Sequence, residues 1–228
     1  FPSSLDNSTA RREVVLGNPP IYQVLGQGVF MGVFAVIIGY LVGAIPCGYL
    51  IGRYGRRIDI RLYGSGNIGT TNAFRILGPQ WGMLVFLGDF LKGVIPVLLA
   101  KWLVGGNIIP VLAGLAAIAG HNWPIYLGFR GGRGVATGSG VILALVPLAV
   151  LVLLVIWGLT ILITRYVSVG SMTVAVLAPI VMGWIGHSWG LALFGLLAGG
   201  FVFYRHLPNL QRLRLGVEPR IGDTRRFW

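Results

Sequence analysis

Residues 135–164 read VATGSGVILALVPLAVLVLLVIWGLTILIT, thirty positions without an Asp, Glu, Lys or Arg. About 20 apolar residues are enough for a helix to cross a membrane, so this stretch is too long for one untilted crossing. Pro147 lies near its middle and interrupts helical hydrogen bonding. We therefore predict two short, tilted spans that meet at a turn near Val146 and Pro147. One long helix with a kink at this proline is the alternative.

Five further apolar runs surround this stretch, and their hydropathy is typical of membrane helices. The whole chain agrees, because 55% of its residues are hydrophobic and only 11% are charged, against roughly 25% charged residues in ordinary soluble domains. We predict an all-α, polytopic integral membrane protein with about seven transmembrane helices, or six if the long stretch is one kinked helix. The other runs cover approximately residues 24–51, 81–102, 108–128, 167–184 and 189–204.

The positive charges predict how the chain is oriented. Fourteen of the eighteen Lys and Arg residues fall on one side of the predicted spans, and such residues accumulate in cytoplasmic loops. The amino terminus is therefore expected outside and the carboxyl terminus in the cytoplasm. The predicted organisation is a polar leader (1–23), one transmembrane domain (24–205) with cytoplasmic motif loops at 52–80, 129–134 and 165–168, and a basic cytoplasmic tail (206–228).

Two of the cytoplasmic loops have the composition of anion-binding loops. The first contains GSGNIGTTN (64–72) and then Arg75, so its glycines allow close backbone approach and its polar side chains add donors. A flexible connection of ordinary loop composition is the alternative. The second reads FRGGRGVATG (129–138), where Arg130 and Arg133 flank glycines at the start of a predicted helix. Arginines that only set the topology and contact lipid phosphates are the alternative here.

The chain ends on a third polar segment. It follows the last predicted span as RHLPN (205–209), and His206 could act there as a donor, an acceptor or a base, although a histidine at a helix end is also a common structural element. The three histidines do not have metal-ligand spacing, and the single cysteine, Cys47, excludes internal disulfides and Cys-based zinc sites. We predict no metal site and no cofactor.

Asp89 and Lys92 are three positions apart inside the second predicted span, hence on one face of a helix. Ionisable groups inside a membrane are costly and are usually paired. We predict a structural or positioning salt bridge, with a proton path as the alternative.

Taken together, four segments resemble one family in order and spacing: GSGNIGTTNAFR, DFLKG, GHNWPIYLGFRGGRGVATG, and RHLPNLQRL with GVE. The chain is similar over about residues 39–222 to the bacterial membrane glycerol-3-phosphate acyltransferases that use acyl phosphate as the donor. The resemblance implies a seven-span fold in the bacterial inner membrane, with three motifs facing the cytoplasm. It also implies that the product is 1-acylglycerol 3-phosphate (lysophosphatidic acid), in the first step of phospholipid synthesis.

The resemblance also implies roles for individual residues. Ser65, Arg75 and His206 match positions implicated in catalysis. Asp89 and Lys92, as a salt bridge, and Glu218 are expected to be structural. This sequence departs from the family at Arg130 and Arg133, where lysines are usual, and guanidinium groups favour two-point phosphate binding. The residues expected to bind substrate are Asn67, Thr71, Arg130, Gly131, Gly132, Arg133, Gly134, Ser171 and Asn209.

The implied reaction needs no acyl-enzyme, because an acyl phosphate is already activated and the C1 hydroxyl of glycerol 3-phosphate can attack it directly. Arg75 and Arg133 would stabilise the developing charge, with Ser65 and backbone N–H groups as further donors. Two candidates for the base stay open: His206, and the phosphate oxygens of the donor.

Two other classes of protein were considered. A transporter or channel for a phosphorylated solute needs a polar pathway, but the predicted spans carry almost no ionisable residues beyond Asp89 and Lys92. A nucleic-acid-binding anchor would fit the basic tail, but the arginines between 205 and 226 lack interleaved stacking aromatics. We therefore expect acyl phosphate, glycerol 3-phosphate and membrane lipids as partners, no nucleic acid, and a monomer.

Overall fold

The computed structural model describes residues 21–222, with side chains from residue 28 onward. All of its regular elements are helical. Most of the predicted leader (residues 1–20) and the end of the predicted tail (223–228) lie outside the described residues. The helices are α2 (Ile21–Gly43), α3 (Cys47–Leu50), α4 (Thr70–Leu77), α5 (Pro79–Leu103), α6 (Ile108–Asn122), α7 (Val135–Leu145), α8 (Pro147–Thr164), α9 (Val167–Ile185), α10 (Trp189–Arg205) and α11 (Leu207–Arg214). Short helical turns are η1 (Ile51–Gly55), η2 (Ile60–Leu62) and η3 (Ile125–Leu127).

Each of the seven predicted spans corresponds to a helix of its own. The division of the long stretch at Pro147 is confirmed, because α7 ends at Leu145 and α8 begins at this proline. The lengths correct the expected count of spans. Within residues 21–222, five helical segments are long and apolar enough to cross a membrane, and a sixth exists if α10 and α11, bent by 50° at their junction, count as one. The eleven residues of α7 rise only about 16 Å, short of the roughly 30 Å hydrocarbon core.

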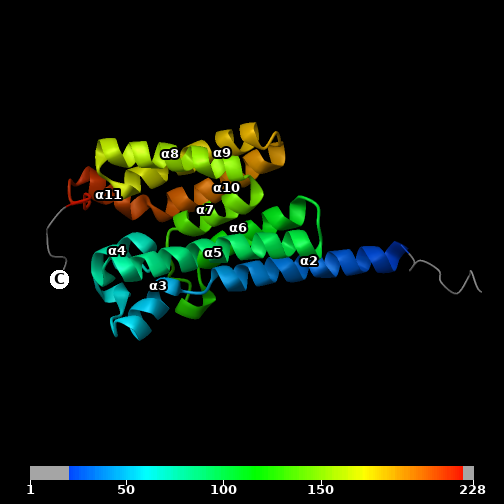
Figure 1. Cartoon of the computed structure of the whole chain (residues 1–228), viewed down its shortest axis with the longest axis horizontal. Helices are drawn as coiled ribbons and strands as arrows, with labels where there is room; N and C mark the ends of the chain where they lie inside the picture. The colour runs from blue at the N-terminus through cyan, green and yellow to red at the C-terminus, as the bar shows by residue number, and fades with distance from the viewer. Residues whose placement is uncertain (1–20, 223–228) are drawn as a thin grey trace, which may run out of the picture.

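The long helices lie side by side in two layers (Figure 1). The lower layer in that view contains α2, α5 and α6, the upper one contains α8, α9 and α10, and α7 lies between them. The short helices α3, α4 and α11 gather at one end, beside the described carboxyl end of the chain. The segment expected as the first cytoplasmic loop, residues 52–80, contains η2 and α4 and thus caps this end with helical structure.

Glycines bring the helix backbones close together. A Cβ atom on Gly43 of α2 would collide with the backbone of Ala117 in α6. One on Gly93 of α5 would collide with Thr137 in α7. Association of membrane helices depends on such close packing of small residues, because lipid tails are as apolar as the side chains. These contacts hold α2, α5, α6 and α7 at fixed spacing and thereby fix the frame of the site.

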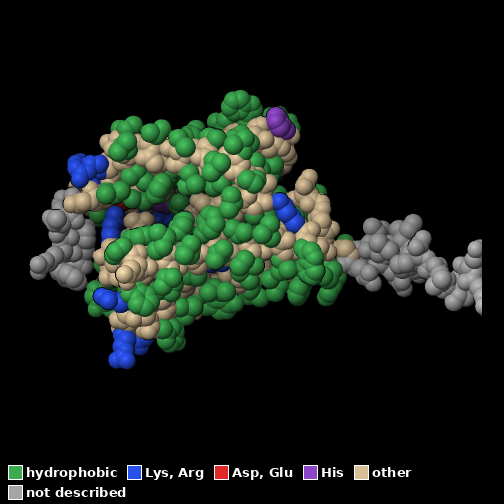
Figure 2. Space-filling model, viewed as in Figure 1, with side chains coloured by type: hydrophobic (Ala, Val, Ile, Leu, Met, Phe, Trp, Pro, Cys, Tyr) green, Lys and Arg blue, Asp and Glu red, His purple; other side chains and the backbone are tan. Residues whose placement is uncertain are grey.

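The surface is apolar along the helices and positive at one end. Figure 2 shows hydrophobic side chains over both layers, whereas Lys and Arg gather mainly at the end of the molecule that carries α4 and α11. Exposed Arg53, Arg56 and Arg57 lie at this charged end, around the end of η1. The chain is thus an all-helical, multi-pass integral membrane protein. Its polar segments, around α4 and α11, lie together at the charged end.

Candidate active site

A cavity of about 930 Å³ opens at the charged end and extends into the bundle. Figure 2 shows a hollow between the two layers there, with basic side chains inside it. The structure brings ten of the predicted catalytic, binding and structural residues into the cavity wall. The ten are Ser65, Asn67, Thr71, Arg75, Asp89, Arg133, Gly134, Ser171, His206 and Glu218.

The first predicted anion-binding loop (residues 64–72) is held in shape by Asn72, a residue to which the sequence analysis gave no individual role. Its buried side chain accepts a hydrogen bond from the backbone N–H of Ser65 (3.0 Å) and donates to the carbonyls of Tyr63 (3.1 Å) and Asn67 (2.9 Å). Asn67 in turn accepts from the N–H of Gly69 (2.7 Å), the residue before α4. An Asn in the first turn of a helix after a glycine loop often bonds to that loop, so the signal was present in the sequence.

The glycine-rich second loop (residues 129–134) is held by hydrogen bonds with two helices, α10 and α6. Arg205, the last residue of α10, donates to the carbonyl of Gly132 through Nε (2.9 Å) and to that of Gly131 through Nη2 (2.7 Å). The N–H of Gly132 donates to the carbonyl of His121 (3.0 Å). Gly134 adopts a left-handed φ of 79° directly before α7. The first N–H groups of α7 have no helical acceptor, and Val135 and Ala136 line the cavity, so this helix end favours an anion there.

The Gly132 position leaves no room for a side chain, because an added Cβ would overlap the imidazole ring of His121. We expect Gly132→Ala to lower the free energy of unfolding by about 2 kcal/mol, the usual range for overpacking a close-packed site. Gly138→Ala is the matched control, since its Cβ would meet only Ile118 at 3.9 Å and alanine favours the helix. Thermal unfolding in detergent measures both, and equal melting temperatures would contradict the expected clash.

The third segment places His206 in the cavity wall with 2% of its surface exposed. Its Nδ1 lies 2.7 Å from the carbonyl oxygen of Val202. Because a carbonyl only accepts, the neutral ring carries its proton on Nδ1, and Nε2 keeps the lone pair. Burial, and next the charge of Arg133, lower the pKa of His206 to about 4. The imidazole is therefore neutral at physiological pH and can accept a proton.

The polar end of the cavity carries an excess of positive charge. Burial, and next repulsion by Arg212, lower the pKa of Arg133 to about 10, so this guanidinium stays charged at neutral pH. Arg75 lies close enough to add to that repulsion. Burial opposes ionisation of Glu218, but hydrogen bonds from Asn209 (2.6 Å) and Arg212 (2.8 Å) outweigh it and hold the pKa of this carboxyl below its usual range. The site is built to bind anions.

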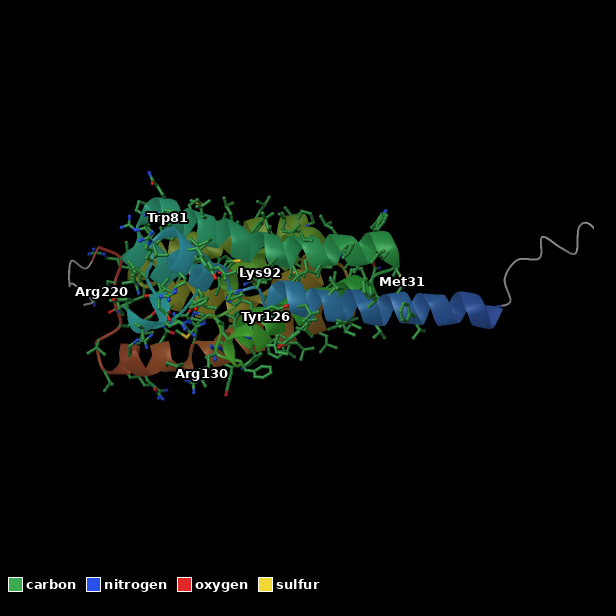
Figure 3. All side chains as sticks on the ribbon, turned by 90° about the horizontal axis from the view of Figure 1, so that it is seen from below. Met31, Trp81, Lys92, Tyr126, Arg130 and Arg220 are labelled. Carbon is green, nitrogen blue, oxygen red and sulfur yellow. The ribbon has the colours of Figure 1, made fainter. Side chains whose placement is uncertain are left out.

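Asp89 and Lys92 form the expected salt bridge, with Nζ 2.8 Å from Oδ1. Lys92 also donates to the carbonyl of Ile45 (2.7 Å) and lies well inside the bundle (Figure 3). Asp89 reaches the cavity wall beside His121, whose Nδ1 lies 3.6 Å from the same carboxylate oxygen. Within residues 21–222, no cluster of three or more His, Cys, Asp or Glu side chains could hold a metal ion.

Four predicted binding residues lie outside the cavity wall. Arg130 is exposed and lies at the edge of the bundle in Figure 3. Gly131 and Gly132 are buried behind the wall, where they receive the hydrogen bonds from Arg205. Asn209 is also buried and contacts Glu218 instead of the cavity. Gly131, Gly132 and Asn209 are thus buried next to the residues that line the cavity and form hydrogen bonds that hold the wall in place.

Residues that follow the last helix complete the wall, although the sequence gave them no role apart from Glu218. Arg220, Ile221 and Gly222 line the cavity. Arg165 holds this segment in place, because its carbonyl accepts from the N–H of Ile221 (2.8 Å) and its Nη2 donates to the Ile221 carbonyl (3.0 Å). Arg220 donates to the hydroxyl of Tyr166 (2.8 Å) and lies at the charged end in Figure 3.

The cavity becomes apolar away from the charged end. Its deeper walls come from α7, α8, α9 and α10, and they carry mostly aliphatic and aromatic side chains and glycines. Met83 and Leu154 line it as well, and both are about half exposed on the outer surface. An anion-binding end thus continues into an apolar space that reaches the membrane-facing surface.

Comparisons with known proteins identify the same type of molecule. Residues 33–216 match the family described as glycerol-3-phosphate acyltransferase. The chain is 45% identical over 193 residues to glycerol-3-phosphate acyltransferase 2 of Moorella thermoacetica, which covers 85% of this chain and 99% of that protein.

Two solved structures of PlsY (YgiH), an integral membrane glycerol 3-phosphate acyltransferase, have a similar fold. Its glycerol 3-phosphate form is 39% identical with a TM-score of 0.80, and covers 84% of this chain and 96% of that chain. Its lysophosphatidic acid form is 38% identical with a TM-score of 0.78, and covers 84% and 95%.

Proposed function

Because this chain belongs to the glycerol-3-phosphate acyltransferase family, we propose that it transfers a fatty acyl group from acyl phosphate to the C1 hydroxyl of glycerol 3-phosphate. The products are 1-acylglycerol 3-phosphate and inorganic phosphate. One observation carries this proposal: a single cavity joins a cationic end to an apolar end. Such a space suits a reaction between two phosphates, one of which bears a fatty chain. No cofactor is needed for it.

The proposed substrate sites follow from the geometry of the polar end. Arg133 and the N-terminus of α7 hold the phosphate of glycerol 3-phosphate, the role that the family resemblance implies for this glycine loop, and Arg75 with the first loop (residues 64–72) holds the phosphate of the donor. The fatty chain of the donor lies in the apolar part of the cavity. Two anions that would repel each other in water are thereby held in register, which supplies much of the catalytic advantage.

In the proposed step, the C1 oxygen of glycerol 3-phosphate attacks the carbonyl carbon of the acyl phosphate, and the bond between that carbon and the phosphate oxygen breaks. Phosphate leaves with the bonding electrons, and Arg75 and Arg133 stabilise its charge. The proton of the hydroxyl passes to Nε2 of His206, or to an oxygen of the departing phosphate. Ser65 is a further donor to the developing oxyanion.

We further propose that the protein lies in the bacterial inner membrane with the charged end in the cytoplasm. The gathering of Lys and Arg at that end supports this orientation. With the amino terminus outside and the carboxyl terminus in the cytoplasm, the number of crossings is odd. We therefore propose that the short helix α7 adds a seventh crossing to the six candidate spans, with α10 and α11 counted as one. Labelling of single cysteines tests the orientation. One cysteine is placed at residue 57 or at residue 187 in a variant without Cys47, and a thiol reagent that does not cross membranes is added to either side of sealed vesicles. We expect residue 57 to react from the cytoplasmic side and residue 187 from the opposite side.

Phosphate release by the purified protein tests the reaction. Palmitoyl phosphate is supplied with and without glycerol 3-phosphate, and palmitoyl-CoA is supplied as a parallel donor. We expect release that requires both substrates, yields lysophosphatidic acid and is lost in Ser65→Ala. With palmitoyl-CoA the leaving group is the CoA thiol, so lysophosphatidic acid is measured directly in that arm. Its formation from palmitoyl-CoA but not from palmitoyl phosphate would contradict the proposed donor. No lysophosphatidic acid with either donor, from protein shown to be folded, would contradict the activity and favour transport of a phosphorylated solute.

A further inference from the structure

The apolar part of the cavity has a floor. Measured from the charged end, each of four helices ends its contribution to the wall on one apolar side chain: Ile142 of α7, Val150 of α8, Ala178 of α9 and Phe194 of α10. The packed core continues directly beyond them, since Ala149, Val181 and Met182 belong to the same hydrophobic cluster as Phe194 but do not line the cavity. The cavity therefore ends against close-packed side chains.

Phe194 is the bulkiest part of this floor. Among the described residues it ranks first by volume of those that are fully buried, with 1% of its surface exposed. The α10 residues above it that line the cavity are smaller: Gly195, Ala198, Gly199 and Val202. The wall that α10 contributes is thus formed by small residues along its length and ends at one buried aromatic residue.

The position of the floor corresponds to the depth of one lipid leaflet. Phe194 lies twelve residues before His206 on α10, which is a rise of about 18 Å. Half of a typical hydrocarbon core is about 15 Å. A fatty chain that starts at the polar end and runs down the cavity therefore reaches the floor within the length of an ordinary membrane lipid chain.

On the basis of the proposed function, we propose that Phe194 sets the upper limit of the acyl chain that this enzyme accepts, because its ring closes the apolar end of the cavity. A chain that is too long has to push into a close-packed core or leave methylenes in unfavourable positions. Because lipid tails are as apolar as the pocket, a chain gains little from burial as such, and the discrimination between chain lengths comes from overpacking against the floor.

A competition assay tests this proposal. The enzyme in lipid mesophase receives glycerol 3-phosphate and an equimolar mixture of saturated acyl phosphates from lauroyl to arachidoyl, and mass spectrometry measures the lysophosphatidic acid products. Such ratios report relative kcat/KM and are independent of the amount of active enzyme. We expect Phe194→Ala to favour chains two methylenes longer than the wild-type limit by about tenfold, because the substitution relieves the overpacking penalty for such chains. Val150→Phe should shift the profile toward shorter chains.

Met182→Ala is the matched control, because Met182 is fully buried in the same core but does not line the cavity. It should destabilise the protein and leave the chain profile unchanged. An unchanged profile in folded Phe194→Ala, or an equal shift in Met182→Ala, would overturn the proposal; if Phe194→Ala does not fold, the profile of Val150→Phe decides. Wild-type protein that transfers no acyl chain would instead refute the proposed function itself.

Discussion

Replacing Arg133 with methionine is expected to raise the KM for glycerol 3-phosphate about 100-fold. Arg133 lines the cavity beside the N-terminus of α7, and its charge persists at neutral pH. Removing one partner of a buried charge pair costs about 2 to 5 kcal/mol, because the other charge loses its counterpart after desolvation. Initial rates at saturating acyl phosphate, with glycerol 3-phosphate varied, measure the change.

The same substitution at Arg130 is a stringent control. Both arginines are in one short loop, and both are expected from sequence to bind substrate, but Arg130 is exposed and lies outside the cavity wall. Arg130→Met should change the KM less than threefold, as for an exposed charge that interacts across solvent. Comparable losses in the two variants would show that the phosphate lies elsewhere. Arg133→Lys should retain most of the affinity, because a lysine keeps the charge and loses only the two-point geometry.

His206→Gln should lower turnover about 100-fold or more with little change in either KM, if His206 accepts the proton of the attacking hydroxyl. The tautomer imposed by the Val202 carbonyl leaves the lone pair on Nε2, which suits this role. His187→Gln is the control, because His187 is exposed and follows α9, at the opposite end of α10 from His206. A variant at residue 206 with near-normal turnover would assign the proton to the donor's own phosphate.

The pH profile of kcat/KM provides an independent check of the same role, since it reports the free enzyme. A base must be unprotonated, so activity falls as the pH drops through its pKa. The lowered pKa of His206 places this acid limb near pH 4, and not near 6.5 as for an unperturbed histidine. A limb at 6.5 that disappears in His206→Gln would mean that the ring is more solvated during the reaction than in the unliganded protein.

The apolar helices were predictable because hydropathy specifies which segments enter lipid. Pro147 marks the boundary between α7 and α8, whereas Pro96 and Pro179 lie inside α5 and α9. The count of spans was less predictable. Gly134 and Pro147 limit α7 to eleven residues, but hydropathy does not reveal that so short a helix packs between the two layers, where Gly93 and Gly140 allow close approach of the backbones of α5 and α7.

The composition of the site could be predicted better than its geometry. Anion-binding loops follow from glycine and arginine content, but which arginine faces the cavity depends on the backbone. Gly128 and Phe129 adopt positive φ values of 58° and 63° immediately before Arg130, which is exposed, whereas Arg133, three residues later, lines the cavity. The support of the glycine loop by Arg205 joins residues more than seventy positions apart, which no local pattern indicates.

The half-exposed rim residues Met83 and Leu154 have a kinetic consequence. Under the proposed function, the acyl phosphate donor dissolves in the bilayer and we expect it to reach the cavity sideways past these residues, whereas glycerol 3-phosphate arrives from water. The encounter with the donor is then two-dimensional. We expect its saturation to follow the mole fraction of acyl phosphate among the surrounding lipids, with inert lipid acting as a diluent although the bulk concentration of donor is unchanged.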